Sequence, residues 1–336
     1  VPATTPGTLD WDCFSFGVIQ GSDHFTFYSS VDHLNSDGMS AGPIFLDIHL
    51  RYHDLVAGRT VAAPAVGGYL DYTARQREHV ANTTPASQEI QDWTTFAEDA
   101  DGDWPSFPLP LGDTSTDNRG DLVTVELLTA EETEVFDMAC RGAGARFSGG
   151  VMACAAMAER EFTGKTVFRG FTPSDTRTAG VDTLTAGWFA SLFPVTVTMG
   201  DGTFGDAARA AQESFDANRS MASVPFERVL ELTPADQLGI KLPSQPPIMV
   251  SYLDFRRIPV ASLWDETNFG IYCDDLSHGG INMWINRDAE RTTAAISFPD
   301  NEVARASVHR YLAALGTAFA SAASTTESRP QIPARA

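Results

Sequence analysis

Cysteine is scarce in this chain. The four cysteines are far apart and none belongs to a CxxC pair, which excludes a zinc knuckle and gives no sign of a disulfide framework. We expect them to be buried thiols. They are Cys13, Cys140, Cys154 and Cys273.

Positive charge is also scarce. The chain has 23 lysines and arginines against 44 aspartates and glutamates, which gives a formal net charge of -21. Phosphate backbones are bound by clustered Lys and Arg, so this balance excludes a nucleic-acid partner. An acidic surface favours solubility, and we prefer this interpretation of the net charge to one in which a site attracts cationic ligands.

Long apolar runs and a secretory leader are missing. No stretch approaches the roughly 18 to 20 apolar residues that cross a bilayer, and residues 1–17 lack the charged and apolar regions of a signal peptide. The sequence therefore predicts a cytoplasmic protein. With 336 residues and 43% hydrophobic content, the chain is long enough for two domains or one large two-lobed unit.

Several catalytic signatures are absent as well. The chain has no GxSxG elbow and no GxxxxGKS/T loop, which removes the commonest serine hydrolases and the P-loop NTPases. Gly142 and Gly144 lie between two predicted helices, so they indicate an interhelical loop and not a dinucleotide site. His49 and His53 have helical spacing, but no third ligand completes a zinc pattern, so no metal site is predicted.

What is present indicates an α/β protein of layered type. Residues 11–33 alternate as a β-hairpin does, and helices are predicted over 39–57 and 71–82. Residues 98–121 are rich in Pro, Gly and Asp and predict a linker, so we divide the chain into an N-terminal lobe, 1–110, and a C-terminal lobe, 111–336.

The second lobe mixes strands and helices. Thr129 and Glu132 have the spacing of a capping box and open a helix. The mixed order of elements predicts layered lobes rather than a barrel. Strands are predicted at 122–128, 166–173, 188–199, 246–260, as a pair within 270–288, and at 292–299, and further helices at 149–162, 205–219 and 302–322.

The stretch SVDHLNSDGMS, residues 30–40, carries the spacing HxxxDG. A neutral imidazole at a strand end can take a proton from a hydroxyl that attacks a carbonyl, so His33 is the candidate general base. Asp37 would hold the loop through a salt bridge, and Gly38 would allow close backbone packing or a positive φ. On spacing alone, a purely structural role for this stretch is favoured.

Other segments add a family resemblance. SVDHLNSDGMS resembles the HHxxxDG motif of the condensation-domain and chloramphenicol acetyltransferase-like superfamily. Four further motifs follow in that superfamily's order. They are 68–80, AGWFASLFPVTV at 186–197 (similar to GxFx(N/S)xxP), SVPFERVLEL at 223–232 and VSYLDFRRIP at 250–259. SFPLPLGD, SFDANR and NFGIYCDDLSHG look most like the mycobacterial polyketide-associated acyltransferases, particularly the branch that acylates trehalose.

The resemblance implies two lobes, each a mixed sheet covered by helices, with an active-site tunnel between them. It also implies that an acyl thioester, of CoA or a carrier protein, is attacked directly by a sugar hydroxyl while His33 Nε2 takes the proton. No acyl-enzyme and no cofactor are expected. The resemblance also makes a polyketide synthase a candidate partner of the protein, and a membrane surface a candidate location close to it.

The chain departs from the family pattern in two places. Asp32 stands where the family has its first histidine, and the two motifs upstream of HHxxxDG are absent, so we expect the chain to begin inside the first lobe. Those motifs contribute the arginine that pairs with the motif's aspartate. Arg177 is the first candidate to replace it as partner of Asp37, and Arg256 or Arg257 are next.

Two further sets of residues are site candidates. Trp188, Phe189 and Phe193 would line an acyl tunnel, or else they belong to an ordinary core strand. Asn268 lies where the family has a structural DFGWG-type loop, so it would hold the tunnel rather than take part in chemistry.

Two alternatives to an O-acyltransferase stay open. A peptide-bond-forming condensation domain would normally sit beside carrier modules, and no carrier-type serine motif is present. A non-catalytic remnant that binds acyl thioesters or a synthase is the other alternative, although His33 and Gly38 are intact.

Overall fold

The protein is described by a computed structural model that covers residues 14–60, 65–100, 104–115, 120–177, 180–200, 202–233, 248–258, 261–272 and 280–324. The chain divides into two compact units. Unit 1 comprises 1–82, 175–191 and 257–274, and unit 2 comprises 83–174, 192–256 and 275–336. These units are interleaved along the chain, so their limits differ from the single boundary that we placed near residue 110.

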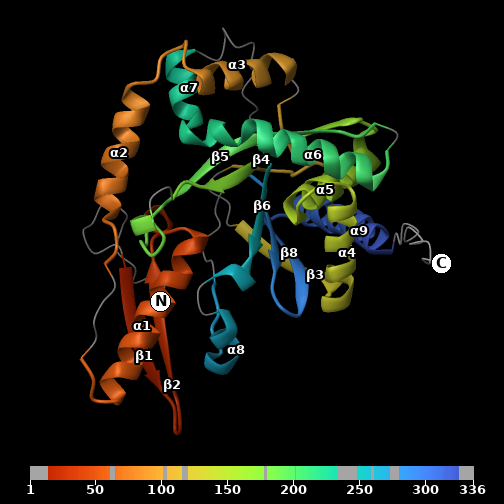
Figure 1. The fold of residues 1–336 in the computed structure, drawn as a ribbon. Helices are drawn as coiled ribbons and strands as arrows, with labels where there is room; N and C mark the ends of the chain where they lie inside the picture. The colour runs from red at the N-terminus through yellow and green to blue at the C-terminus, as the bar shows by residue number, and fades with distance from the viewer. Residues whose placement is uncertain are drawn as a thin grey trace, which may run out of the picture. The chain divides into compact units, whose positions relative to one another are not determined.

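The described part of unit 1 contains a β-hairpin and α-helices (Figure 1). Strands β1 (Phe14–Gln20) and β2 (Phe25–Val31) pair in antiparallel register, as the alternating sequence predicts. Phe25 on β2 contacts Tyr52 on α1 at 5.4 Å between ring centres. The predicted helices are confirmed, and a third one is short. They are α1 (Ala41–Val56), α2 (Tyr69–Ala81) and α8 (Trp264–Thr267).

Unit 2 is built on the six-stranded mixed sheet, ordered β3-β8-β7-β6-β4-β5. β3 pairs antiparallel with β8 and β8 with β7, whereas β6 runs parallel to both β7 and β4. This is the mixed sheet that we expected of each lobe; the described part of unit 1 has only the two-stranded hairpin. The strands are β3 (Gly120–Thr129), β4 (Val167–Asp175), β5 (Ala190–Thr198), β6 (Met249–Asp254), β7 (Asn282–Arg287) and β8 (Arg291–Pro299).

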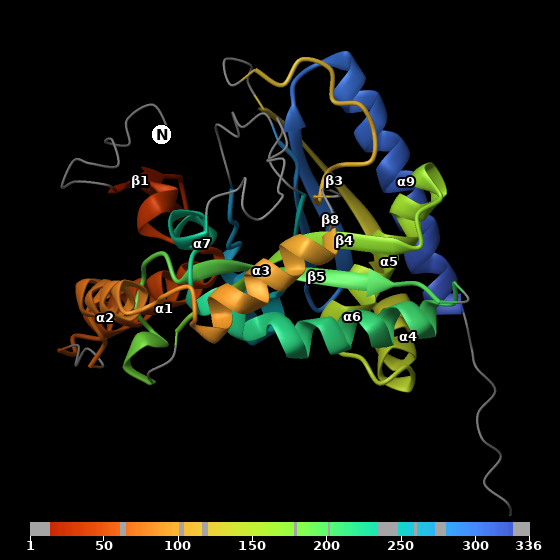
Figure 2. The same cartoon turned by 90° about the horizontal axis from the view of Figure 1, so that it is seen from above.

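Helices cover this sheet (Figure 2). Helices α4 and α9 pack against β3 and β8, and α5 packs between them and α6. Small side chains allow this close packing: a Cβ on Gly150 would lie 2.2 Å from the sulfur of Cys140. The predicted capping box of Thr129 and Glu132 opens α4. The helices are α3 (Gln88–Ala100), α4 (Ala130–Gly142), α5 (Phe147–Thr163), α6 (Phe204–Asn218), α7 (Phe226–Leu232) and α9 (Glu302–Ser324).

The prediction that residues 98–121 form a linker is wrong in one respect. Residues 104–115 form no helix or strand, as their composition predicts, but Trp104, Phe107 and Leu111 are buried in the core of unit 2. The side-chain amide of Asn301 donates hydrogen bonds to the backbone carbonyls of Leu111 and Asp113, and these bonds hold the segment in place. Proline, glycine and aspartate disfavour regular structure, but they do not by themselves keep neighbouring aromatic side chains in water.

Two other predictions fall partly outside the described residues, and a third lies within them. Of the strand pair predicted within 270–288, the structure describes one strand, β7, and residues 273–279 are not described. Cys140 and Cys154 are buried free thiols as predicted, whereas Cys13 and Cys273 lie outside the described residues. Gly142 and Gly144 lie at the predicted connection between α4 and α5.

Candidate functional site

The stretch after β2 forms two tight turns that lead into α1. Asp32 caps the first turn, since its carboxylate accepts a hydrogen bond from the amide of Leu34 at 2.9 Å. Asp37 caps the second turn, and its carboxylate accepts from the amide of Ser40 at 2.8 Å. Asp and Ser favour such positions because their side chains bond to nearby backbone groups. The residue at the family's first histidine position therefore acts here as a cap.

His33 is exposed at the start of the first turn. Its Nδ1 lies 2.8 Å from the carbonyl oxygen of Ser36. A carbonyl only accepts hydrogen bonds, so Nδ1 carries the proton and donates it. In the neutral ring Nε2 then has the free lone pair, which is the form that a general base requires.

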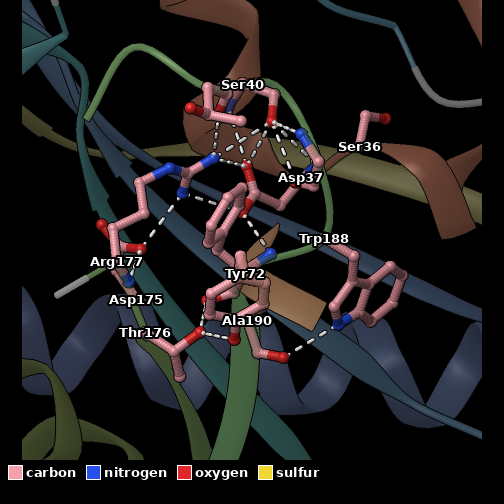
Figure 3. A network of polar contacts seen from close by, with 12 residues as sticks. Ser36, Asp37, Ser40, Tyr72, Asp175, Thr176, Arg177, Trp188 and Ala190 are labelled. Atoms are coloured by element: carbon pink, nitrogen blue, oxygen red, sulfur yellow. Dashed lines mark hydrogen bonds and ion pairs between the residues drawn. The ribbon is translucent and has the colours of Figure 1, made fainter. Parts of the chain in front are cut away.

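Asp37 and Arg177 form a bidentate ion pair within unit 1 (Figure 3). Arg177 donates to Asp37 through both terminal nitrogens, at 2.9 and 3.0 Å. The two side chains are only 6% and 8% exposed. Burial alone lowers the pKa of Arg177, but the hydrogen bonds and charge of Asp37 outweigh it and raise that pKa above its usual value. Arg177 is the partner ranked first from the sequence, whereas Arg256 pairs with Asp254 in unit 2.

Ser40 connects this ion pair to the segment before β5, and the sequence reasoning missed it. Its hydroxyl lies 2.7 Å from Asp37 Oδ1 and accepts from Arg177 at 3.2 Å and from the Gly187 amide at 3.1 Å. Asp37 in turn accepts from the Phe189 amide at 3.0 Å. The spacing D-x-x-S between Asp37 and Ser40 is a capping-box signal that could have indicated the contact.

Tyr72 on α2 is a second residue that the sequence reasoning missed. The Thr176 hydroxyl donates to the Phe189 carbonyl at 2.6 Å, so the Tyr72 hydroxyl donates to Thr176 in turn. Burial raises the pKa of Tyr72, which keeps its hydroxyl protonated as a donor. The ring of Phe189 lies 4.2 Å from that of Tyr72 and 4.1 Å below the guanidinium of Arg177. Aromatic and cation–π contacts of this kind stabilise the buried charge.

The three predicted tunnel residues differ in their surroundings. Phe189 is 0% exposed and packs in unit 1, and Phe193 is buried in unit 2 against Phe215. These contacts account for the burial of both rings without a ligand. Trp188 is 36% exposed, and its ring centre lies 5.0 Å from that of His33. A role for the three in lining a tunnel stays a prediction.

The remaining candidates have local structural positions. Gly38 is exposed and begins the second turn, and its φ is not in the left-handed region that we allowed for it. Asn268 has a φ of 50° and directly follows α8, where the backbone amide of Phe269 donates to the Trp264 carbonyl. Asparagine tolerates this conformation better than most residues.

No metal site is found in the part of the chain that the structure describes. His49 and His53 lie together on α1 with ring centres 4.6 Å apart. Within the described ranges, no group of three metal-ligating side chains forms. Among the same residues, none of the helices is both long and apolar enough to span a bilayer.

The chain is similar to proteins named as acyltransferases. Acyltransferase PapA3 of Mycobacterium tuberculosis (strain ATCC 25618 / H37Rv) is 44% identical over 320 residues, which cover 94% of this chain and 67% of that protein. Trehalose-2-sulfate acyltransferase PapA2 of the same strain is 43% identical over 317 residues, covering 94% and 68%. These relatives confirm the resemblance that the five motifs indicated.

Solved structures give the same result for the fold. A structure of PapA2 acyl transferase matches with a TM-score of 0.87 and 42% identity, over 96% of this chain and 71% of that one. The epimerization domain of tyrocidine synthetase B matches with a TM-score of 0.69 and 14% identity, over 93% and 72%, and shows the shared fold alone. The condensation-domain family itself matches residues 10–241. The chain belongs to the condensation-domain family.

Proposed function

We propose that this protein is an O-acyltransferase that moves an acyl chain from a thioester to a hydroxyl of trehalose or a trehalose derivative, with His33 as general base. The relatives at 43–44% identity carry the name acyltransferase, and one of them is named for trehalose 2-sulfate. A relative at 42% identity is named 2'-acyl-2-O-sulfo-trehalose (hydroxy)phthioceranyltransferase. The observation that carries the mechanism is the hydrogen bond from His33 Nδ1 to the Ser36 carbonyl. It leaves Nε2 as the basic nitrogen.

The proposed reaction uses this nitrogen twice. Nε2 takes the hydroxyl proton as the sugar oxygen attacks the thioester carbonyl, and the new C–O bond gives a tetrahedral intermediate. When the intermediate collapses, the C–S bond breaks and the leaving thiolate takes the proton back from Nε2. The acyl group is never attached to the protein, so protons and bonds balance within one ternary complex.

Asp37 and Arg177 have a structural role in this proposal. Their side chains are buried and pair with each other, so neither is placed to exchange a proton with a substrate. They hold the second turn, which follows the one that carries His33, and the segment that carries Trp188. Positioning of this kind matters because a misplacement of about 1 Å can cost a hundredfold in rate.

The donor and the product follow from the same chemistry. CoA or the carrier protein of a polyketide synthase would present the acyl thioester. The acylated sugar would have an apolar chain and a polar head, so we propose that the product enters a membrane surface near the enzyme.

Free-thiol release from palmitoyl-CoA, with and without trehalose, tests this function. Wild-type protein should show release that trehalose stimulates, and His33→Ala should lower the stimulated rate by about 100-fold or more. His53→Ala, on α1 of the same unit, is the matched control and should keep the wild-type rate.

Two results would contradict the proposal. A His33→Ala variant with the wild-type rate would remove His33 as the base. Wild-type protein that forms no acylated sugar from trehalose or from trehalose 2-sulfate, as judged by mass spectrometry of the products, would remove the proposed acceptor class.

A further inference from the structure

Trp188 is held on both sides by the buried network of unit 1. The amide before it, on Gly187, donates to the Ser40 hydroxyl at 3.1 Å. The amide after it, on Phe189, donates to the Asp37 carboxylate at 3.0 Å. The backbone of Trp188 is therefore tied to the same groups that hold the turn after His33.

The polar groups of Trp188 itself are also engaged (Figure 3). Its indole N–H donates to the Ala190 carbonyl at 2.8 Å, as Figure 3 shows. Its backbone carbonyl accepts a hydrogen bond from the Tyr69 hydroxyl at 3.0 Å. The bond to Ala190 fixes the rotation of the indole ring. Although Trp188 is about one third exposed, both its carbonyl and its indole N–H are hydrogen-bonded within unit 1.

The fixed indole lies against the proposed base. The ring centres of Trp188 and His33 are 5.0 Å apart, and the ring planes are inclined by 44°. This separation is within the range of favourable aromatic contacts. The hydrogen bond to Ser36 sets the direction of Nδ1, but an exposed ring with one hydrogen bond can still tilt about it. The indole limits this tilt and thereby limits the direction of Nε2.

We infer that Trp188 is a positioning residue for His33, and that its indole keeps Nε2 directed at the acceptor hydroxyl. The inference rests on the proposed function. It differs from the tunnel-wall prediction, because a wall residue would act on the binding of the acyl donor, whereas a positioning residue acts on the rate of the bound complex.

Steady-state kinetics of Trp188→Met and Trp188→Phe separate these roles. Methionine fills much of the indole volume without an aromatic ring, so kcat should fall at least about tenfold while both KM values stay within about twofold. Phenylalanine keeps a ring against His33 and should recover most of the lost kcat. Tyr52→Leu, which removes a half-exposed ring from α1, should leave kcat unchanged.

Three outcomes would overturn the inference. Trp188→Met could keep the wild-type kcat; it could raise the KM for the acyl donor with kcat unchanged, as a tunnel wall would; or Trp188→Phe could lose as much kcat as Trp188→Met at the same melting temperature. An inactive wild-type protein would instead overturn the proposed function, so the two failures are distinguishable.

A measurement on the folded protein covers the case in which Trp188→Met does not fold. The chain has seven histidines, and the NMR signal of the His33 ring is the one that disappears in His33→Ala. In wild-type protein this signal should carry the ring-current shift of a proton beside an indole, and Trp188→Phe should move it. A His33 signal that Trp188→Phe leaves in place would show that the rings are not in contact.

Discussion

His33 and Asp37 are four residues apart, but they have opposite surroundings. The His33 ring is exposed and donates a hydrogen bond through Nδ1, whereas the Asp37 carboxylate is buried and accepts bonds from Arg177, Ser40 and Phe189. His33 begins the first short turn, and Asp37 caps the second. This contrast separates the proposed chemical role from the structural one.

Breaking the buried pair should lower stability and activity together. In Asp37→Ala, Arg177 loses both hydrogen bonds to Asp37 at a site where its side chain is 6% exposed, and Asp175, whose side chain is 41% exposed, is left as an ion-pair partner; removing one member of a buried pair typically costs about 3 kcal/mol. We expect a lower melting temperature and at least about a tenfold lower rate of trehalose-stimulated thiol release. Thermal unfolding and the thiol assay measure the two effects.

Asp175→Ala is the matched control for this prediction. Asp175 also pairs with Arg177, at 3.1 Å, but its side chain is 41% exposed. Exposed pairs contribute about 1 kcal/mol or less, so this variant should lose little. An Asp37→Ala protein that loses activity at an unchanged melting temperature would refute the structural role of Asp37.

At the scale of elements, local patterns predicted most of the described helices and strands. The hairpin β1–β2, helices α1 and α2, and the capped start of α4 all follow from alternation, helical spacing or a capping box, which act over a few neighbouring residues. The buried segment 104–115 was missed because its burial depends on contacts with Asn301 and the core, far along the chain.

The contact between α2 and the segment before β5 requires a glycine. A Cβ on Gly187 would lie 2.3 Å from the ring of Tyr69. In Gly187→Ala the Tyr69 ring must move, and its hydrogen bond to the Trp188 carbonyl is lost. We expect a loss of about 1–3 kcal/mol in the free energy of unfolding, and a lower kcat, since Trp188 loses one of its restraints.

Gly180→Ala provides the comparison. A Cβ at Gly180 meets no atom within 4 Å, so this variant should stay within about 0.5 kcal/mol of wild type. Equal stability and equal kcat of the two variants, measured by denaturant unfolding and the thiol assay, would argue against the restraint on Trp188.

At the scale of the molecule, buried tyrosines predict how stability depends on pH. Burial raises the pKa of tyrosines in both units above 10.0. Their contribution to stability is fully present below the pKa of the unfolded chain, about 10, and is lost as pH rises through the folded pKa. The residues are Tyr69 and Tyr72 in unit 1 and Tyr252 and Tyr311 in unit 2.

The melting temperature should therefore fall by at least about 3 °C between about pH 9 and about pH 11. Tyr311→Phe should reduce this slope, because the Tyr311 hydroxyl is fully buried and has no hydrogen-bond partner among the described residues. A melting temperature that stays constant over this range, or an equal slope in Tyr311→Phe, would contradict the prediction.

The sequence by itself determined the α/β class, the family, the position of His33 and the choice of Arg177 as partner of Asp37, because these depend on short motifs and on their order along the chain. Only the tertiary structure showed the contacts of Ser40, Tyr72 and Trp188. Segments more than a hundred residues apart meet within unit 1, and no local pattern records which side chains face each other there. The direction of the nitrogen that we propose as the proton acceptor depends on those contacts.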